Sequence, residues 1–109
     1  MEKCKRSEVE GAVDFEGERV PFSGAGFFKL DFYTGGKYSG YAVENKFTEK
    51  KSYSVHFKYF QDQEVFARTQ TGSRFFMRID DGKNNPLVIV RQSEFKRLLD
   101  GLSGIEETI

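Results

Sequence analysis

The spacing of apolar residues changes several times along the chain, and three stretches have the periodicity of a helix. Val9, Ala12 and Val13 share one helical face and predict a short helix over residues 3–15. The last helical pattern places Phe95, Leu98 and Leu99 on one side, with Ser93 as the expected N-cap and an end near Gly101.

The second helical pattern is the longest. It begins at Ser54, the expected N-cap, and closes at Thr71-Gly72, where a C-terminal glycine is common. The residues that share its predicted face are Val55, Tyr59, Val65, Phe66 and Thr69, with Phe60 beside them.

Aromatic and β-branched runs between these helices predict five strands. They cover residues 19–22, 27–33, 38–47, 74–79 and 86–91. Residues 34–37 are of types common in turns and are expected to join strands 27–33 and 38–47 into a hairpin. Residues 80–85 predict a second turn. The order α-β-β-β-α-β-β-α predicts an α/β fold with a mixed β-sheet flanked by helices.

Length and composition bound the class of protein. The 109 residues suffice for one domain, expected over residues 1–101, with residues 102–109 as a flexible acidic tail. A single cysteine, Cys4, indicates a reducing compartment. The longest apolar run, residues 87–90, is too short to span a membrane, and the first residues lack a signal peptide. We therefore expect a cytoplasmic protein of a bacterial, archaeal or phage-infected host cell, with no membrane partner.

Charge at first argues against a nucleic-acid partner, because 17 basic residues balance 17 acidic ones. The last ten residues contain three acids and no base, however, so residues 1–99 carry 17 basic against 14 acidic groups. Lys46, Lys50, Lys51 and Lys58 are opposed only by Glu49 between residues 45 and 58. Such a patch could hold phosphates, or it could be an ordinary solvated loop and helix start.

The predicted hairpin carries the strongest candidate chemistry. Side chains alternate along a strand, so Glu44 and Lys46 share a face with Asn45 opposite, and the turn returns Asp31 to the side of Glu44. Two carboxylates inside apolar strands are costly unless they are paired or bind a metal. A solvated polar face, or an ion pair between Lys46 and Asp31, is the structural alternative.

Four motifs occur in order: Ser23-Gly24-Ala25-Gly26, Lys29-Leu30-Asp31, Val43-Glu44-Asn45-Lys46, and the run from Thr48 to Ser54. Together they resemble the signature of small phage and archaeal Holliday-junction resolvases, members of the PD-(D/E)xK (restriction-endonuclease-like) superfamily. The resemblance extends from about Arg19 to Leu99, although Leu30 stands where that family usually has glycine.

The resemblance implies a restriction-endonuclease-like core and a divalent-metal site for Mg²⁺ or Mn²⁺. Its catalytic residues would be Asp31, Glu44 and Lys46, with Asp31, Glu44, the backbone carbonyl of Asn45 and an acid of the first helix as metal ligands. For that acid Glu10 is preferred over Glu8, and Gln61 or Gln63 would project toward the site. The implied DNA-binding residues are Ser23, Lys29, Lys50, Lys51, Ser52 and Lys58.

The activity implied by the resemblance is hydrolysis of DNA phosphodiester bonds, with branched DNA such as a Holliday junction as substrate. Because one site cannot cut two strands symmetrically, a homodimer is expected. Two alternatives remain: a non-catalytic DNA-binding or phage regulatory domain that keeps the fold, and a nicking endonuclease that acts on linear duplex DNA.

Overall fold

A computed structural model of the chain describes residues 2–20 and 30–108, and within them the elements follow the predicted order. The helices are α1 (Lys3–Asp14), α2 (Phe57–Phe66) and α3 (Gln92–Thr108). The strands are β1 (Glu18–Arg19), β2 (Phe32–Tyr33), β3 (Tyr41–Phe47), β4 (Arg74–Asp80) and β5 (Leu87–Ile89). A 3₁₀ turn (Gly36–Tyr38) precedes β3, and a π-helical segment (Ala67–Thr71) extends α2.

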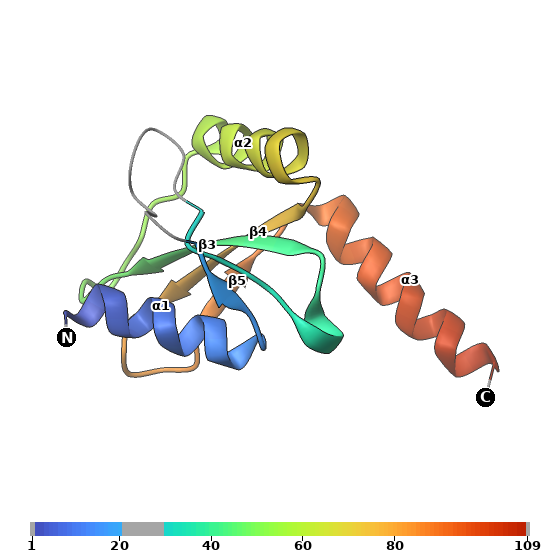
Figure 1. Cartoon of the computed structure of the whole chain (residues 1–109), viewed down its shortest axis with the longest axis horizontal. Helices are drawn as coiled ribbons and strands as arrows, with labels where there is room; N and C mark the ends of the chain where they lie inside the picture. The colour runs from blue at the N-terminus through green and yellow to red at the C-terminus, as the bar shows by residue number, and fades with distance from the viewer. Residues whose placement is uncertain (1, 21–29, 109) are drawn as a thin grey trace.

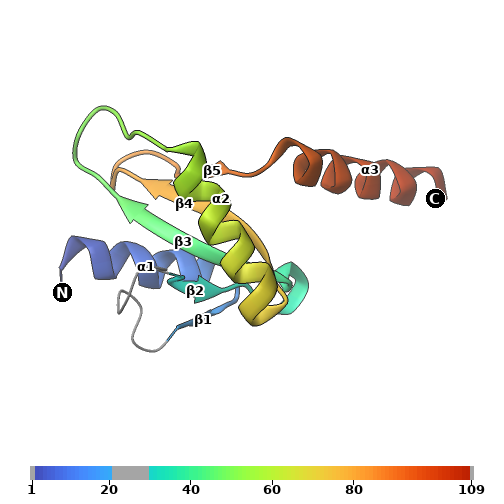
Figure 2. The same ribbon diagram turned by 90° about the horizontal axis from the view of Figure 1, so that it is seen from above.

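The described strands form one mixed sheet in the order β1-β2-β3-β4-β5, all five labelled in the view from above (Figures 1 and 2). β3 and β4 are parallel neighbours, with Glu44 beside Met77, and every other neighbouring pair is antiparallel. The crossover from β3 to β4 contains α2, as a parallel connection requires. The mixed α/β sheet expected from the sequence is therefore confirmed, whereas the restriction-endonuclease-like core remains a prediction.

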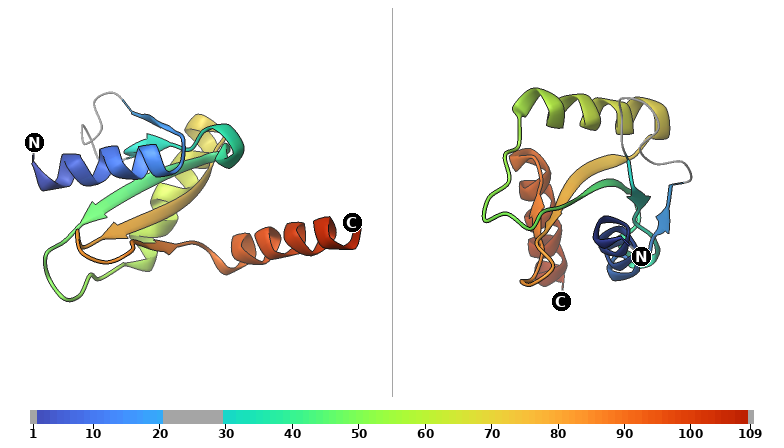
Figure 3. Two further views of the ribbon diagram at one scale, coloured as in Figure 1. Left: turned by 90° about the horizontal axis from the view of Figure 1, so that it is seen from below. Right: turned by 90° about the vertical axis from the view of Figure 1, so that its left-hand side faces the viewer.

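The two faces of the sheet are covered by different helices, α1 on one side and α2 on the other (Figure 3). On the α2 side, Ala42, Phe60 and Phe75 belong to one buried cluster. On the α1 side, Val43 and Phe76 belong to a second cluster. Adjacent residues of β3 and β4 thus pack against opposite helices, as the period of two requires.

Two glycines allow α1 and the chain after it to lie close to the sheet. A Cβ at Gly11 would lie 3.0 Å from Cε1 of Phe32 and 3.1 Å from Cδ of Arg78. A Cβ at Gly17 would lie 1.9 Å from the backbone oxygen of Tyr33, a distance that no side chain tolerates. Gly17 therefore fixes the path from α1 into β1.

Helix α2 differs from its prediction in the residue at which it starts and in the side chains that it buries. It begins at Phe57 with His56 as N-cap, so the expected cap at Ser54 is wrong. Its buried side chains are Phe60 and Gln63, whereas Val65, predicted on the packed face, is 37% exposed. Thr69, also predicted on the packed face, is exposed as well. The predicted end is confirmed, because Gly72 closes the π-helical segment at φ 67°.

The remaining boundaries shift by a few residues. β3 and β5 are shorter than predicted, whereas β4 extends one residue beyond its predicted end. Residues 21–29, which include parts of two predicted strands, lie outside the described residues. α3 starts at Gln92, so Ser93 lies in its first turn and is not its cap. The helix also continues through Gly101 to Thr108, so the predicted end at Gly101 is wrong.

Candidate functional site

The candidate site lies where β2 and β3 meet the first turns of α2. Glu44 contacts Tyr59 of α2, whereas the side chain of Asn45 contacts Ser7 of α1. Lys46 lies over the ring of Tyr59, with Nζ 5.6 Å from the ring centroid. The predicted alternation, with Glu44 and Lys46 on one face and Asn45 on the other, is confirmed.

Asp31 directly precedes β2, beside Glu44, because the register pairs Phe32 with Val43. Its backbone N–H donates to the oxygen of Val43 at 2.8 Å. Its carboxylate Oδ2 accepts the backbone N–H of Asn45 at 2.7 Å, in the middle of β3. The side chain is only 7% exposed, so the hairpin brings a buried carboxylate to Glu44 as expected.

Glu44 is the most deeply buried ionisable group of the candidate site, with 0% of its surface exposed. Its Oε1 accepts the hydroxyl of Tyr59 and lies 2.8 Å from Nζ of Lys46. Its Oε2 is buried and has no hydrogen-bond partner. Lys46 thus pairs with Glu44 and not with Asp31, the partner considered in the structural alternative.

Burial and neighbouring charges shift the proton affinities of these groups. Burial raises the pKa of Asp31 to about 7; the Asn45 N–H opposes this shift, and negative charge on Glu8 and Glu44 adds to it. Burial acts to lower the pKa of Lys46, but the bond to Glu44 outweighs it and the pKa is raised. Burial and the bond to Glu44 raise the pKa of Tyr59 to about 12. Lys46 is therefore a protonated donor at neutral pH.

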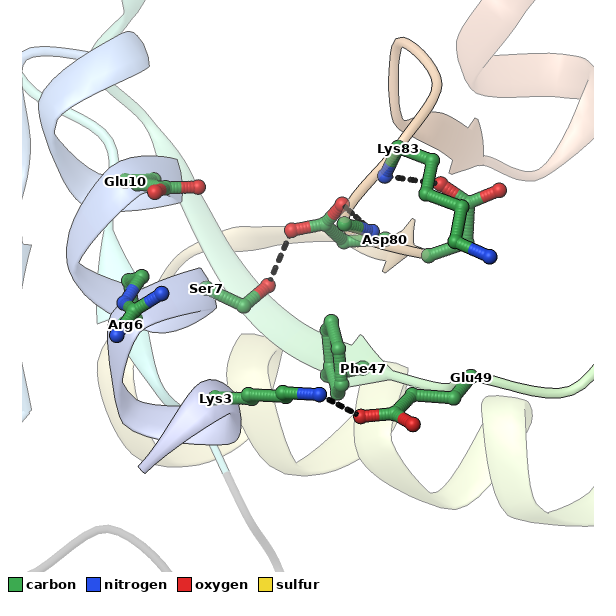
Figure 4. A pocket seen from close by; sticks show the side chains of 10 residues that line it. Lys3, Arg6, Ser7, Glu10, Phe47, Glu49, Asp80 and Lys83 are labelled. Carbon is green, nitrogen blue, oxygen red and sulfur yellow. Dashed lines mark hydrogen bonds and ion pairs between the residues drawn. The ribbon is translucent and has the colours of Figure 1, made fainter. Parts of the chain in front are cut away.

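The two candidate acids of α1 lie in different surroundings. Glu8 is half-buried, lies 3.4 Å from Arg19, and is the one whose charge acts on Asp31. Glu10 is exposed and lines a pocket of about 470 Å³ between α1 and the end of β4. Figure 4 shows this pocket, with Lys3 bound to Glu49 across it. The structure thus associates Glu8, and not the preferred Glu10, with the candidate site.

A buried polar network on the α1 face of the sheet was not predicted. Ser7 donates to Asp80 at 2.6 Å (Figure 4). The Ser7 hydroxyl also accepts from Nδ2 of Asn45 at 2.9 Å. Nη1 of Arg78 donates to Oδ1 of Asn45 at 2.7 Å and to the Ser7 backbone oxygen at 3.1 Å. The signal in the sequence is Arg78 itself, a charged residue within the apolar run of β4. The side chain of Asn45 therefore belongs to this buried network, whereas the predicted role of Asn45 as a metal ligand concerns only its backbone carbonyl.

Gln63 of α2 is a second buried polar residue, and it faces the sheet. It lies one helical turn after Tyr59, is 1% exposed, and its Oε1 has no hydrogen-bond partner. Gln61, the other glutamine considered, is exposed. Of the two, only Gln63 is buried between α2 and the sheet.

The predicted DNA-binding residues are divided among several places. Ser23 and Lys29 lie outside the described residues. Lys50, Lys51 and Ser52 are exposed in the loop after β3 and line a pocket of about 360 Å³. Lys58 is bound to Asp62 at 2.8 Å on the surface of α2. Lys50 and Lys51 therefore form the basic part of this loop.

Among residues 2–20 and 30–102, whose side chains the structure describes, no cluster of three or more histidine, cysteine, aspartate or glutamate side chains is arranged to hold a metal ion. No helix in the described part of the chain has the length and apolar character that crossing a membrane requires. Comparisons with models of protein families, with curated proteins and with solved structures found no match.

Proposed function

We propose that the chain is a metal-dependent DNA endonuclease that hydrolyses phosphodiester bonds, with branched DNA as its substrate. The observation that carries the proposal is the buried pair of Asp31, directly before β2, and Glu44 of the neighbouring strand β3, with Lys46 2.8 Å from Glu44. Placing two carboxylates and an ammonium inside a sheet has a large desolvation cost, and a bound cation would offset part of that cost.

The oxygens of this pair suit Mg²⁺ or Mn²⁺. Glu44 Oε2 is buried with no hydrogen-bond donor, and hard carboxylate oxygens are the ligands these ions prefer. The proposed ligands are the carboxylates of Asp31 and Glu44 and the carbonyl of Asn45. Glu8, in place of Glu10, would be the acid of α1 that acts on Asp31 through its charge, and it is not a proposed ligand. When bound, the ion would polarise the phosphate and lower the pKa of a water.

Lys46 would hold the attacking water and the phosphate, and would not act as a base. Its pKa is raised by Glu44, so its ammonium group keeps its protons and can donate to an anionic oxygen. The hydroxyl of Tyr59 shares Glu44 Oε1 with Lys46 and fixes the direction of the pair. Tyr59 is thus a proposed positioning residue.

DNA would reach this site along the loop after β3. Lys50, Lys51 and Ser52 are exposed there and immediately follow the strand that contains Glu44 and Lys46. Cationic side chains in such a loop contact phosphates without reading the base sequence. Two symmetric cuts require two sites, so the proposed enzyme is a homodimer, and it would act inside a bacterial, archaeal or phage-infected cell.

One observation favours a second candidate, a non-catalytic DNA-binding domain. Oε1 of Glu44 is in contact with both Lys46 and Tyr59, as it would be in a purely structural group. In that case the chain binds DNA through the loop after β3 but cleaves none.

The test compares a synthetic four-way junction with linear duplex of the same sequence, in Mg²⁺, in Mn²⁺ and in EDTA. The proposal predicts cleavage of the junction in either metal, none in EDTA, and none by Glu44→Ala or Lys46→Ala. Cleavage in EDTA would refute the metal site. Binding of both DNAs with no cleavage under any condition would establish the non-catalytic candidate, and cleavage of duplex alone would exclude the branched substrate.

A further inference from the structure

The end of helix α2 and the start of helix α3 line a second polar hollow, at the opposite end of the sheet from the candidate site. The hollow has a volume of about 580 Å³, and Gly40, directly before β3, lies at its wall. Lys46 lies near the other end of β3, and a strand of this length spans about 20 Å. The hollow is therefore distinct from the candidate site and from the loop after β3.

Three arginines line this hollow from three parts of the chain. They are Arg68 of the π-helical segment, Arg74 of β4 and Arg91, which directly precedes α3, and all three are exposed. A guanidinium group carries several N–H donors in one plane, a geometry that suits a phosphate through two parallel hydrogen bonds. The hollow thus collects the side chain best suited to bind phosphate.

The two carboxylates at the hollow are each already paired with an arginine. Glu64 accepts from Nε of Arg91 at 2.9 Å. Glu94 accepts from Nη2 of Arg97, which approaches it from the next turn of α3, at 2.6 Å. Because each glutamate is neutralised in this way, the other two arginines of the hollow carry positive charge in excess.

Those two arginines, Arg68 and Arg74, are the least engaged. Among the described residues, the side chain of Arg68 has no hydrogen-bond or ion-pair partner. Arg74 has one long contact, 3.5 Å from its Nη1 to Oε2 of Glu94. The hydroxyls of Ser73 and Ser93, two further walls of the hollow, also have no partner in the part of the chain that the structure describes. Donors of both kinds are therefore available to an anion.

We propose that this hollow is a binding site for a phosphate group, with Arg68 and Arg74 as its main donors and Arg91 and the two serine hydroxyls beside them. The phosphate is either part of a DNA strand or a free ion, because both present anionic oxygens to a guanidinium group. The site goes beyond the proposed function and does not rest on it, since nothing in it requires cleavage at Glu44.

Two probes separate these sources, inorganic phosphate and a short fluorescein-labelled DNA duplex, both in EDTA so that no metal contributes. Thermal denaturation in phosphate, against chloride at the same ionic strength, follows the free ion, and fluorescence anisotropy follows the duplex. Arg68→Ala and Arg74→Ala should each weaken the binding of the probe that occupies the site by about 10-fold.

Arg6→Ala is the matched control. Arg6 of α1 is likewise exposed, and its side chain has no partner among the described residues, so its loss should leave both measurements unchanged. Far-ultraviolet circular dichroism should be the same for all variants, because Arg68 holds no other described side chain in place.

A loss of duplex affinity in both variants would identify a DNA strand as the source of the phosphate. A loss of stabilisation by phosphate, with unchanged duplex affinity, would identify the free ion. Variants at Arg68 and Arg74 that respond to both probes like the wild type, or an equal loss in Arg6→Ala, would overturn the site. Cleavage of the junction in Mg²⁺ is measured separately: a chain that passes this test but cleaves no DNA refutes the nuclease alone, and an active nuclease that fails it refutes the phosphate site alone.

Discussion

Nζ of Lys46 lies 2.8 Å from Oε1 of Glu44, two residues earlier on the same strand, and both side chains face α2. The hydroxyl of Tyr59 donates to the same oxygen. One carboxylate oxygen therefore holds both a cation and a phenol, whereas the other, Oε2, is buried with no donor. This division leaves one oxygen of Glu44 available to a further ligand.

Replacing Tyr59 with phenylalanine removes the hydroxyl and keeps the ring below Lys46. We expect Tyr59→Phe to lower the free energy of unfolding by about 1–3 kcal/mol, because Glu44 loses a buried hydrogen bond. Chemical denaturation measures the effect. Tyr53→Phe, at a ring 39% exposed, is the matched control and should change it by less than about 0.5 kcal/mol. Equal effects from both variants would contradict the assigned role of Tyr59.

The titration of Asp31 makes the stability of the metal-free protein depend on pH. The pKa of Asp31 is about 7 in the folded chain against an ordinary value of 3.8, so between these values the folded state keeps a proton that the unfolded state releases. The free energy of unfolding should therefore fall as pH rises through this range, by at most about 4 kcal/mol from this group, and level off above it.

Asp31→Asn cannot ionise and should flatten that dependence. The measurement is urea denaturation in EDTA at about pH 5, 6, 7 and 8 for both proteins. The variant should gain most, relative to the wild type, at the highest pH. A variant that tracks the wild type at every pH would show that Asp31 does not titrate in this range.

Arg78 is the centre of the polar network on the α1 face and is 3% exposed. Arg78→Ala should lower the free energy of unfolding by about 3–5 kcal/mol. It removes the cation that lies 3.7 Å from the buried Asp80 carboxylate and the donor to Oδ1 of Asn45. Arg74→Ala, at a side chain 50% exposed on the same strand, should cost about 0–1 kcal/mol. Thermal denaturation compares the two, and a larger loss at Arg74 would contradict the network.

Gly17 is required where the chain passes the backbone of Tyr33. Gly17→Ala should lower the free energy of unfolding by at least about 2 kcal/mol or prevent folding, because its Cβ would meet the Tyr33 oxygen at 1.9 Å. At Gly101, in α3, a Cβ meets nothing within 4 Å, so Gly101→Ala should raise helical content and cost no stability. An unperturbed Gly17→Ala protein would refute the close approach.

The sequence alone could predict the order of the elements and the meeting of Asp31, Glu44 and Lys46. Both rest on local rules: hydrophobic period separates helices from strands, and alternation plus one turn fixes the face and position of three side chains. The fold class needed nothing beyond these patterns.

Other features depend on how the elements dock. The rotation of α1 about its axis decides that Glu8, and not Glu10, acts on Asp31 through its charge, and Gly11 lets α1 approach Phe32 and Arg78 closely. The rotation of α2 about its axis buries the polar Gln63 and exposes the apolar Val65, although the apolar spacing predicts Val65 on the packed face. Tertiary packing overrides periodicity in such cases, so the contact of Tyr59 with Glu44 was not predictable.

The central claim is tested most directly by the rate of Mg²⁺-dependent junction cleavage under single-turnover conditions for Glu44→Gln. The substitution keeps the size of the side chain and removes its charge, and Lys83→Gln on the distant pocket rim is the control. The account predicts that Glu44→Gln folds and binds the junction but cleaves it at least about 1000-fold more slowly than the wild type, while Lys83→Gln cleaves normally. Cleavage by Glu44→Gln at the wild-type rate would contradict the account.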